Sequence, residues 1–542
     1  MVPNERTRSE LDLANYDHII IGSGINALVC AALLSRRTRV LVLEREDVIG
    51  GTVRTDELAP GFTYDPLATT FLLFQAGPAF AALGEALAAE GVAFAATGKP
   101  TGVLMSDGRS LVLGRDRAAN IAAFDAVLAG EGERFQADMA DVEANAELLF
   151  GLFNNAIWTF GTASLLARQA VKRGPRALMG FFGRALISDR RRLATRYRSD
   201  LAQALFAPWP LHAGLNPDQP FSGQMGALMG FALEAIGAPV VVGGAAQLTG
   251  ALRAIIERAG STVRTGADAD RILPGTDGRD VKGIALAGGE EIDAPSVICS
   301  VTPQQLYGRL LRDWTQPKGT PDAVARYGYG KGNLQIHYAL DRPIAWSDPT
   351  LGDVQLLHLC DGVDAVSKAS NEAERGMLPE RPVVCIGQPT AADPSRAPDG
   401  KAVAWIQIPQ APRTLKGDAA GTIDVPDDGS WTEAVREAFA DRVEVMIAAH
   451  AADFRGSIIS RKVISPADLA VMNVNLVDGD PYGGWCGLDQ FFLFRPLPDQ
   501  VNHKTFVNNV YHIGASTHPG PGLHGTSGYL LARKLAPRGG LS

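Results

Sequence analysis

The chain has 542 residues, of which 46% are hydrophobic and 20% charged, so it is long enough for two or three domains and too apolar for a disordered protein. Its 51 lysines and arginines against 59 acidic residues give a net charge of −8, which argues against a dedicated nucleic-acid binder. The five cysteines form no C-x-x-C pair and no zinc-ligand spacing. We therefore expect neither a metal site nor a disulfide framework.

The first 15 residues carry both charge signs and lack the apolar stretch of a secretory signal, so we expect a flexible tail there. No run of about 18 uncharged apolar residues occurs, and the sequence therefore predicts no membrane-spanning helix. We expect a cytoplasmic protein, with peripheral membrane contact left open.

From Tyr16 the sequence reads YDHIII, GSGINA, an Ala/Leu-rich stretch and RVLVLE, which predicts a strand, a tight turn, a helix and a second strand. Gly22 and Gly24, on either side of Ser23, allow a phosphate to approach the backbone, and Asn26 and Ala27 follow in the first helical turn. Ala27 lets the helix pack closely against the strand, so that a pyrophosphate can meet the helix N-terminus. Glu44 can accept hydrogen bonds from ribose hydroxyls. A bare G-x-G-x-x-A also occurs for steric reasons, but the whole unit favours a dinucleotide site.

A second glycine-rich stretch, GGTVRT, follows at Gly50 and Gly51. The backbone from Gly51 to Thr52 could add donors to the same phosphates, and Arg54 could add a guanidinium. The alternative is a surface turn with a solvated arginine.

Further along the chain, residues 243–272 predict a helix followed by strands, and 296–299 a strand that re-enters the first sheet. The nucleotide-binding domain is thus expected to be discontinuous. Beyond residue 327, the segments GNLQIHYAL, VQLLHL, PVVCIGQP and AVAWIQIP are short and partly alternating, which predicts a different sheet in a substrate domain.

Residues 511–529 hold five glycines among small and aromatic residues, which would let a planar ring approach the backbone. A helix is expected to follow, with its N-terminal amides near that ring. His518 and His524 in this loop are the candidates for catalysis, although such histidines more often serve a structural role. A purely structural glycine-rich loop is the alternative.

Three segments together resemble the flavin-dependent oxidoreductases of the phytoene desaturase type, within the amine oxidase-like flavoproteins. They are GSGINALVCAALLSRRTRVLVLEREDVIGGTVRTDE, VVVGGAAQLTGALRAIIERAG and GASTHPGPGLHGTSGY. The segments GDPYGGWCGLDQFFLFRP and ERPVVCIGQPTAADPSRAPDGKAVAWIQIP are most similar to the branch called pyridine nucleotide-disulfide oxidoreductase domain-containing protein 2. Disulfide reduction is disfavoured here, because the chain lacks the necessary cysteine pair.

The resemblance implies an α/β fold, with a discontinuous Rossmann-like FAD-binding domain and a sheet-plus-helix substrate domain. The expected FAD-binding residues are Gly22, Ser23, Gly24, Asn26, Ala27, Glu44, Arg45, Gly51, Thr52, Arg54, Ala269, Gly514, Ala515, Gly522 and Leu523. Tyr482, Trp485 and Phe491 are candidates for the substrate pocket wall, with plain core aromatics as the alternative.

The expected domains are a tail at 1–15, an FAD-binding domain of 16–75, 235–310 and 505–542, a helical insertion at 76–234 and a substrate domain at 311–504. Ten lysines and arginines lie between Leu165 and Asp200, close to apolar stretches. Residues 145–200 could therefore form a membrane surface, a lid or a subunit interface.

We expect an FAD-dependent oxidoreductase that transfers a hydride between flavin N5 and a hydrophobic, polyene- or isoprenoid-like substrate. Two alternatives are a flavin amine oxidase, which would need an aromatic cage, and a non-enzymatic FAD-stabilised interaction protein.

Overall fold

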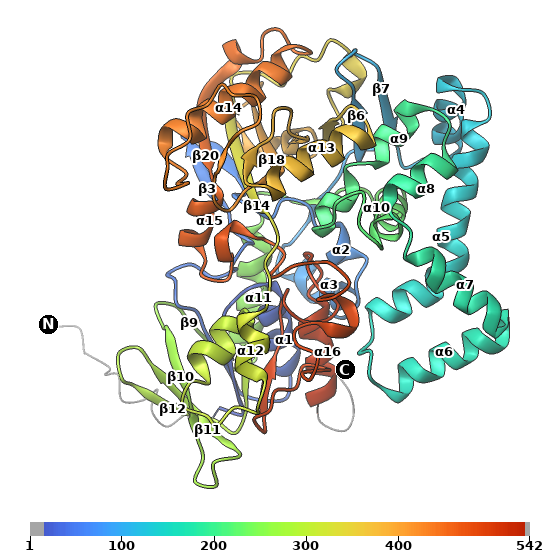
Figure 1. Ribbon diagram of the computed structural model, residues 1–542. Coiled ribbons are helices and arrows are strands. Elements are labelled where there is room, and N and C mark those ends of the chain that lie inside the picture. The colour runs from blue at the N-terminus through green and yellow to red at the C-terminus, as the bar shows by residue number, and fades with distance from the viewer. Residues whose placement is uncertain (1–15, 537–542) are drawn as a thin grey trace, which may run out of the picture.

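The computed structural model describes residues 16–536 of the chain, so the expected tail at 1–15 and the final residues 537–542 lie outside the described part. Figure 1 shows two main layers of structure with a group of helices at one side. The lower part is built on a five-stranded parallel sheet, as the sequence predicts for a nucleotide-binding domain. Its order is β21 (Val510–His512), β13 (Val297–Cys299), β1 (His18–Ile21), β2 (Val40–Leu43) and β9 (Thr262–Arg264).

Helix α1 (Ile25–Leu34) lies at the centre of this domain, and all of its residues are buried. It packs against α11 (Ala246–Arg258) and α16 (Thr526–Leu535) (Figure 1). The contact with α16 is backbone on backbone, because a Cβ added at Gly528 would lie 1.9 Å from the Asn26 carbonyl oxygen. Residues 502 positions apart in the chain thus complete one core.

The opposite face of the sheet is covered by an antiparallel three-stranded sheet. It consists of β10 (Ala269–Pro274), β11 (Val281–Leu286) and β12 (Glu291–Asp293). A π-helical segment, η2 (Gln304–Leu310), and helix α12 (Thr320–Ala325) lie beside it.

The upper part is a seven-stranded sheet with α14 (Glu433–Ala448) packed on its apolar face (Figure 1). The order is β20 (Ile458–Ile464), β14 (Gly332–Leu340), β18 (Ala402–Ala411), β17 (Val384–Gly387), β15 (Leu356–Leu359), β6 (Thr101–Leu104) and β7 (Ser110–Leu113). Neighbours are antiparallel except β15 and β6, which run parallel. Four further helices outside the insertion are α2 (Leu72–Gln75), α3 (Pro78–Ala89), α13 (Val363–Glu374) and α15 (Pro466–Met472). Three short strand pairs are β3 (Asp56–Ala59) with β4 (Phe62–Tyr64), β5 (Phe94–Ala95) with β8 (Val240–Val241), and β16 (Met377–Leu378) with β19 (Gly417–Asp418).

Strands β6 and β7 differ from the sequence expectation, which placed residues 76–234 in a helical insertion. They extend the large sheet of the upper part instead. The hairpin is only four residues long on each side, and its partner β15 lies 255 residues further along the chain. Such a pairing is fixed by tertiary contacts that local periodicity does not reveal.

The helical insertion proper begins at residue 117. It contains α4 (Arg117–Val127), α5 (Glu131–Phe153), α6 (Phe160–Arg173), α7 (Pro175–Ala185), α8 (Asp189–Arg196), α9 (Asp200–Phe206), the 3₁₀ turn η1 (Trp209–Ala213) and α10 (Ser222–Ile236). Helices α6 and α7 protrude from the side of the molecule in Figure 1 and expose large apolar side chains, including Phe160, Val171 and Met179. Within residues 16–536, no helix is long and apolar enough to cross a bilayer.

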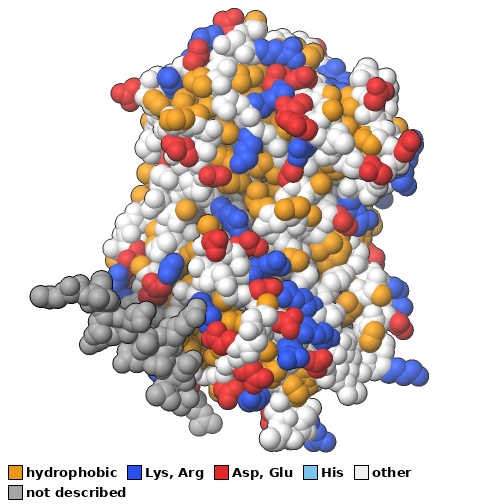
Figure 2. All heavy atoms as spheres, turned by 90° about the vertical axis from the view of Figure 1, so that its left-hand side faces the viewer, with side chains coloured by type: hydrophobic (Ala, Val, Ile, Leu, Met, Phe, Trp, Pro, Cys, Tyr) orange, Lys and Arg blue, Asp and Glu red, His pale blue; other side chains and the backbone are white. Residues whose placement is uncertain are grey.

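Part of the positive charge of the insertion is taken up internally. Arg192 is buried in ion pairs with Asp138 and Asp189, and Arg190 pairs with Asp218. Figure 2 shows the side of the molecule away from α6 and α7, where acidic and basic side chains are mixed.

Candidate functional site

A cavity lies where the carboxyl edge of the parallel sheet faces the seven-stranded sheet. The residues that follow three of the parallel strands line it: Gly22 after β1, Glu44 after β2 and Ser300 after β13. Gly514 lines it shortly after β21. The carboxyl edge is the usual ligand-binding edge of an open parallel sheet.

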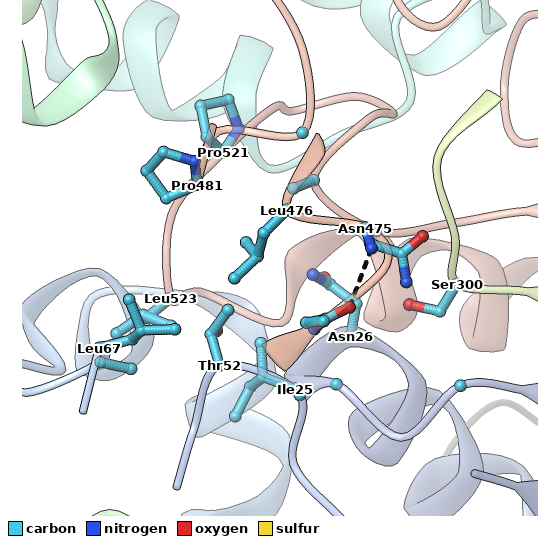
Figure 3. Close-up of a pocket in the computed structure, with 18 of the residues that line it drawn as sticks. Ile25, Asn26, Thr52, Leu67, Ser300, Asn475, Leu476, Pro481, Pro521 and Leu523 are labelled. Carbon is cyan, nitrogen blue, oxygen red and sulfur yellow. Dashed lines mark hydrogen bonds between the residues drawn. The ribbon is translucent and has the colours of Figure 1, made fainter. Parts of the chain in front are cut away.

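The structure brings fourteen of the fifteen predicted cofactor-binding residues to this one cavity. They are Gly22, Ser23, Gly24, Asn26, Glu44, Arg45, Gly51, Thr52, Arg54, Ala269, Gly514, Ala515, Gly522 and Leu523. The fifteenth, Ala27, is fully buried in the core at the first turn of α1, where it packs rather than lines the cavity. Figure 3 shows how segments distant in the sequence meet here, with Asn26 beside Asn475 and Ser300, and Thr52 on the side of Leu67 and Leu523.

The N-terminus of α1 is built to receive an anion. Its N-cap is Gly24, no side chain caps the free amides, and the first turn holds no acid. A Cβ added at Gly24 would meet nothing within 4 Å, which leaves open space above the helix end. Gly22 has a φ of +93°, which favours glycine. The helix dipole and the uncapped amides together suit a pyrophosphate.

Glu44 holds this turn in shape. Its carboxylate accepts hydrogen bonds from the backbone N–H of Ser23 at 3.1 Å and the Ser23 hydroxyl at 2.5 Å. It also accepts from the backbone N–H of Glu46 at 3.0 Å. The carboxylate is buried and lines the cavity, so it both fixes the turn of residues 22–24 and contributes to the cavity surface.

The second glycine stretch closes on the first. The Gly50 N–H donates to the Ser23 carbonyl at 3.1 Å and to its hydroxyl at 3.0 Å. Gly51 has a φ of +61° and lies close to Gly24. Arg54 lines the cavity, and its buried Nε has no hydrogen-bond partner. An unpaired guanidinium N–H beside an uncapped helix end fits the phosphates of a dinucleotide.

The glycine-rich loop of residues 514–525 forms another wall. Gly514 and Gly522 have φ values of +109° and +130°, and both line the cavity with Ala515 and Leu523. The positive φ values bring backbone rather than side chains to the surface, as a planar ring would require. These features fit FAD: a cradle of glycine backbone, a free helix N-terminus and an unpaired arginine N–H.

The two candidate catalytic histidines are not among the residues that line the cavity. Nε2 of His518 lies 3.0 Å from the carbonyl oxygen of Asn155, and Nε2 of His524 lies 3.1 Å from that of Gly520. Nδ1 of His524 also accepts from the Thr526 N–H at 2.9 Å. Burial lowers the pKa of both rings to about 4, so both are neutral at pH 7.

Of the three candidate wall aromatics, the structure places only Tyr482 on the cavity. Its hydroxyl donates to the Leu211 carbonyl at 2.6 Å. Trp485 turns away and donates to Asp489, while Phe491 packs against Gly520 and below the Arg495 guanidinium. The plain-packing alternative therefore describes these two better.

Sequence reasoning missed much of the lining. We call the part of the cavity at the carboxyl edge of the parallel sheet the dinucleotide end. Ser300 and Thr302 line it after β13, and so do Asp268 and Arg309, which form an ion pair at 2.6 Å. Ser300 follows a strand that the sequence predicts, and residues at this edge of a parallel sheet commonly bind ligands, so its place in the lining could have been predicted. The other end of the cavity lies between the seven-stranded sheet and the insertion, and we call it the substrate end. Its residues are Leu72, Leu73, Trp209, His212, Met229, Asn333, Gln335, Leu356, Trp405, Gln407, Pro481 and Tyr482.

No metal site was expected, and one group of described residues bears on that expectation. His212, His358 and Cys385 bring one possible ligand atom each to within 4.8 Å of one another. The two histidines already contact each other, with 3.0 Å between their Nε2 atoms.

Comparison with known proteins identifies the group to which this chain belongs. A family model described as flavin containing amine oxidoreductase matches residues 28–443. The rat protein named pyridine nucleotide-disulfide oxidoreductase domain-containing protein 2 is 28% identical over 95% of this chain and 92% of its own length. A zeta-carotene-forming phytoene desaturase from Myxococcus xanthus is 28% identical over 52% of this chain and 49% of its own.

Among solved structures, putrescine oxidase bound to putrescine superposes with a TM-score of 0.58 at 13% identity, covering 96% of this chain and 98% of its own. That similarity concerns the fold. The family match over most of the chain carries the assignment, and the glycine-lined cavity agrees with it. The chain belongs to the flavin containing amine oxidoreductase family and is an FAD-dependent oxidoreductase.

Proposed function

We propose that this enzyme transfers a hydride between FAD and a carbon atom of a neutral, largely apolar, isoprenoid-like substrate, by desaturation, saturation or oxidation at carbon. The observation that carries the proposal is the contrast within the cavity. Every ionic lining side chain lies at the dinucleotide end, namely Glu44, Arg45, Glu46, Arg54, Asp268 and Arg309. The substrate end is lined by leucine, methionine, tryptophan and neutral polar residues.

In this proposal, the free amides of α1 and the Arg54 guanidinium would hold the pyrophosphate, and Glu44 would face the ribose. The loop of Gly514 and Gly522 would support the flavin ring. Bound FAD supplies the hydride acceptor or donor, and the protein contributes position and exclusion of water. The buried Leu72, Trp209 and Leu356 exclude water from the substrate end.

Amine oxidation is the second candidate. Trp405 and Tyr482 support it, since two aromatic side chains on the cavity wall could flank a neutral amine. The substrate end offers no carboxylate for an ammonium group. For this reason we place carbon oxidation first.

Anaerobic titration of the holoprotein tests both candidates. A panel of isoprenoid hydrocarbons, ketones, alcohols and primary amines is added, and the flavin absorbance at about 450 nm is followed. Reduced holoprotein is mixed with the unsaturated members to test the reverse direction. Redox exchange with isoprenoid compounds but not with amines supports the proposal. Exchange with amines alone would replace it with the second candidate, and no exchange with any compound would favour a non-enzymatic role.

We also propose that α6 and α7 form the contact surface for a membrane. The exposed side chains of Phe160, Val171 and Met179 accompany the exposed basic residues Arg168, Lys172 and Arg176 on the same helical pair. Apolar side chains beside lysines and arginines are typical of an interfacial surface. Self-association through the same surface is the competing interpretation.

A further inference from the structure

A row of polar side chains crosses the middle of the seven-stranded sheet. Gln335 on β14 pairs with Gln407 on β18, Gln407 pairs with Cys385 on β17, and Cys385 pairs with His358 on β15. Directly paired residues in a sheet share a face, so all four side chains point the same way. We call these four residues the polar row.

The next position along the same four strands is entirely aliphatic. Ile336, Ile406, Ile386 and Leu357 are paired in the same order and belong to the core under α14. Because side chains alternate between faces, the polar row must point away from that core. It points toward the cavity, where Gln335 and Gln407 are lining residues.

Asn333 extends the polar surface along β14, two residues before Gln335 and on the same face. It is fully buried, and neither its amide nitrogen nor its amide oxygen has a hydrogen-bond partner. The Tyr482 hydroxyl lies nearby and donates its proton to the Leu211 carbonyl, so toward Asn333 it can act only as an acceptor.

Gln335 and Gln407 also have unused hydrogen-bonding capacity. Within residues 16–536, no hydrogen bond engages the side-chain amide of either one, although the two residues are direct cross-strand partners. The cavity surface therefore carries three carboxamides, from Asn333, Gln335 and Gln407, without protein partners. Of these, the Asn333 amide is fully buried, whereas Gln407 is only partly buried. An unpaired buried polar group costs about 1–3 kcal/mol, so a substrate that covers these carboxamides favours binding if it supplies their hydrogen-bond partner.

The β15 end of the polar row, at His358 and its neighbour His212, is also uncharged. The Nε2 atoms of His212 and His358 lie 3.0 Å apart, so one ring donates to the other. Burial lowers the pKa of His212 to about 4 and that of His358 well below its usual value. Both imidazoles are uncharged at pH 7, and the polar surface offers neutral donors and acceptors rather than charge.

We propose that the substrate bears a neutral oxygen function, a carbonyl or hydroxyl, which the carboxamides of Asn333, Gln335 and Gln407 bind. The inference rests on the proposed function and narrows its substrate class: a pure hydrocarbon would leave three carboxamides unpaired, and a cation would meet no counter-charge. The apolar body of the substrate lies against Leu72, Met229 and Leu356.

Binding to the oxidised holoprotein tests this class without requiring turnover. Limonene, carvone and carvylamine share one skeleton and differ in bearing no oxygen, a ketone or a cationic amine. Each is titrated while the visible spectrum of the bound flavin is recorded. We expect carvone to bind at least about 10-fold more tightly than limonene, as one or two added hydrogen bonds would allow, and carvylamine to bind no better than limonene.

Single-residue variants show which side chains produce the difference in affinity between carvone and limonene. Gln335→Leu and Gln407→Leu should reduce the preference for carvone over limonene to within about 3-fold. Gln247→Leu, at an exposed position of α11 outside the cavity lining, makes the same change of residue type and is the matched control, which should keep the preference. Equal wild-type affinities, tighter binding of the amine, or a preference that survives both glutamine variants would overturn the proposal.

The melting temperature of the probe-free holoprotein gives an independent measurement. Because the carboxamides are unpaired, both leucine variants should melt at or above the wild-type temperature. A fall of more than about 4 °C in both would assign the glutamines a structural role and overturn the proposal, even if no probe binds. Failure of the proposed function is distinguishable, since carvone would then bind without exchanging electrons with the flavin.

Discussion

The two ends of the cavity are built in different ways. At the dinucleotide end, the surface is largely backbone: glycines with positive φ, an uncapped helix and a few ionic side chains such as Glu44 and Arg54. At the substrate end, it is made of side chains from strands and helices far apart in the chain. A cofactor shared by many enzymes demands a fixed backbone, whereas a particular substrate demands particular side chains.

Substitution of Gly24 by valine should give the largest effect and tests whether the dinucleotide end depends on bare backbone. A valine side chain would fill the open space above α1 that the phosphates need. We expect FAD occupancy of the purified protein to fall below about a tenth of the wild-type value, measured from released flavin after denaturation. Gly250→Ala, at an exposed helical position of α11, is the control and should load fully. Normal loading of Gly24→Val would mean that the phosphates lie elsewhere.

Glu44→Gln tests how much one carboxylate contributes to FAD binding at the dinucleotide end. It removes a charge that accepts three hydrogen bonds from Ser23 and Glu46. Because hydrogen bonds to a charged group contribute about 1.5–3 kcal/mol, FAD affinity should fall about 10- to 100-fold. Titration of the apoprotein with FAD measures this change. The exposed Glu85→Gln is the control, and an unchanged affinity in Glu44→Gln would contradict the role of this carboxylate.

The loop histidines lie outside the cavity lining, and their substitution sharpens the comparison. His518→Gln and His524→Gln should change the rate of flavin reduction by less than about 3-fold, since neither ring lines the cavity. His524→Gln should lower the melting temperature by about 2–4 °C, because two backbone hydrogen bonds are disturbed. Stopped-flow kinetics and thermal denaturation separate the outcomes. A loss of about 100-fold in rate with full FAD occupancy would instead make the histidine a catalytic residue.

The smallest effect is expected on the outside of the insertion. The holoprotein should sediment with anionic vesicles, and the bound fraction should fall several-fold at about 0.5 M salt. Changing Arg168, Lys172 and Arg176 together to Glu should abolish this binding, whereas Lys401→Glu, on an exposed loop, should not. Self-association that is lost in Met179→Ser, without vesicle binding, would show a subunit interface instead.

The sequence revealed the dinucleotide end because its requirements are local. A turn such as Gly22–Gly24, followed by an acid at Glu44, has a fixed spacing that periodicity and turn chemistry can recognise. Arg190 to Arg192 illustrates the limit, since the run reads as a basic surface but Arg192 is buried between Asp138 and Asp189.

The substrate end could not be predicted in the same way. The neighbours of Gln407 in the sheet are Gln335 and Cys385, and neither is close to it in the sequence. Strand order and register create this surface, and both depend on tertiary packing. For the same reason, residue type alone could not show which of three aromatic residues lines the cavity. Trp485 and Phe491 were candidates together with Tyr482, and of the three only Tyr482 lines it.

The backbone contact between Asn26 and Gly528 has a consequence for biosynthesis. When a ribosome has synthesised the first 300 residues, strands β1, β2, β9 and β13 exist, but β21 and α16 do not. Helix α1 then lacks one of its two packing partners, and the wall formed by Gly514 and Gly522 is missing. We therefore expect the cofactor cavity to be incomplete in the nascent chain until residue 535 has emerged.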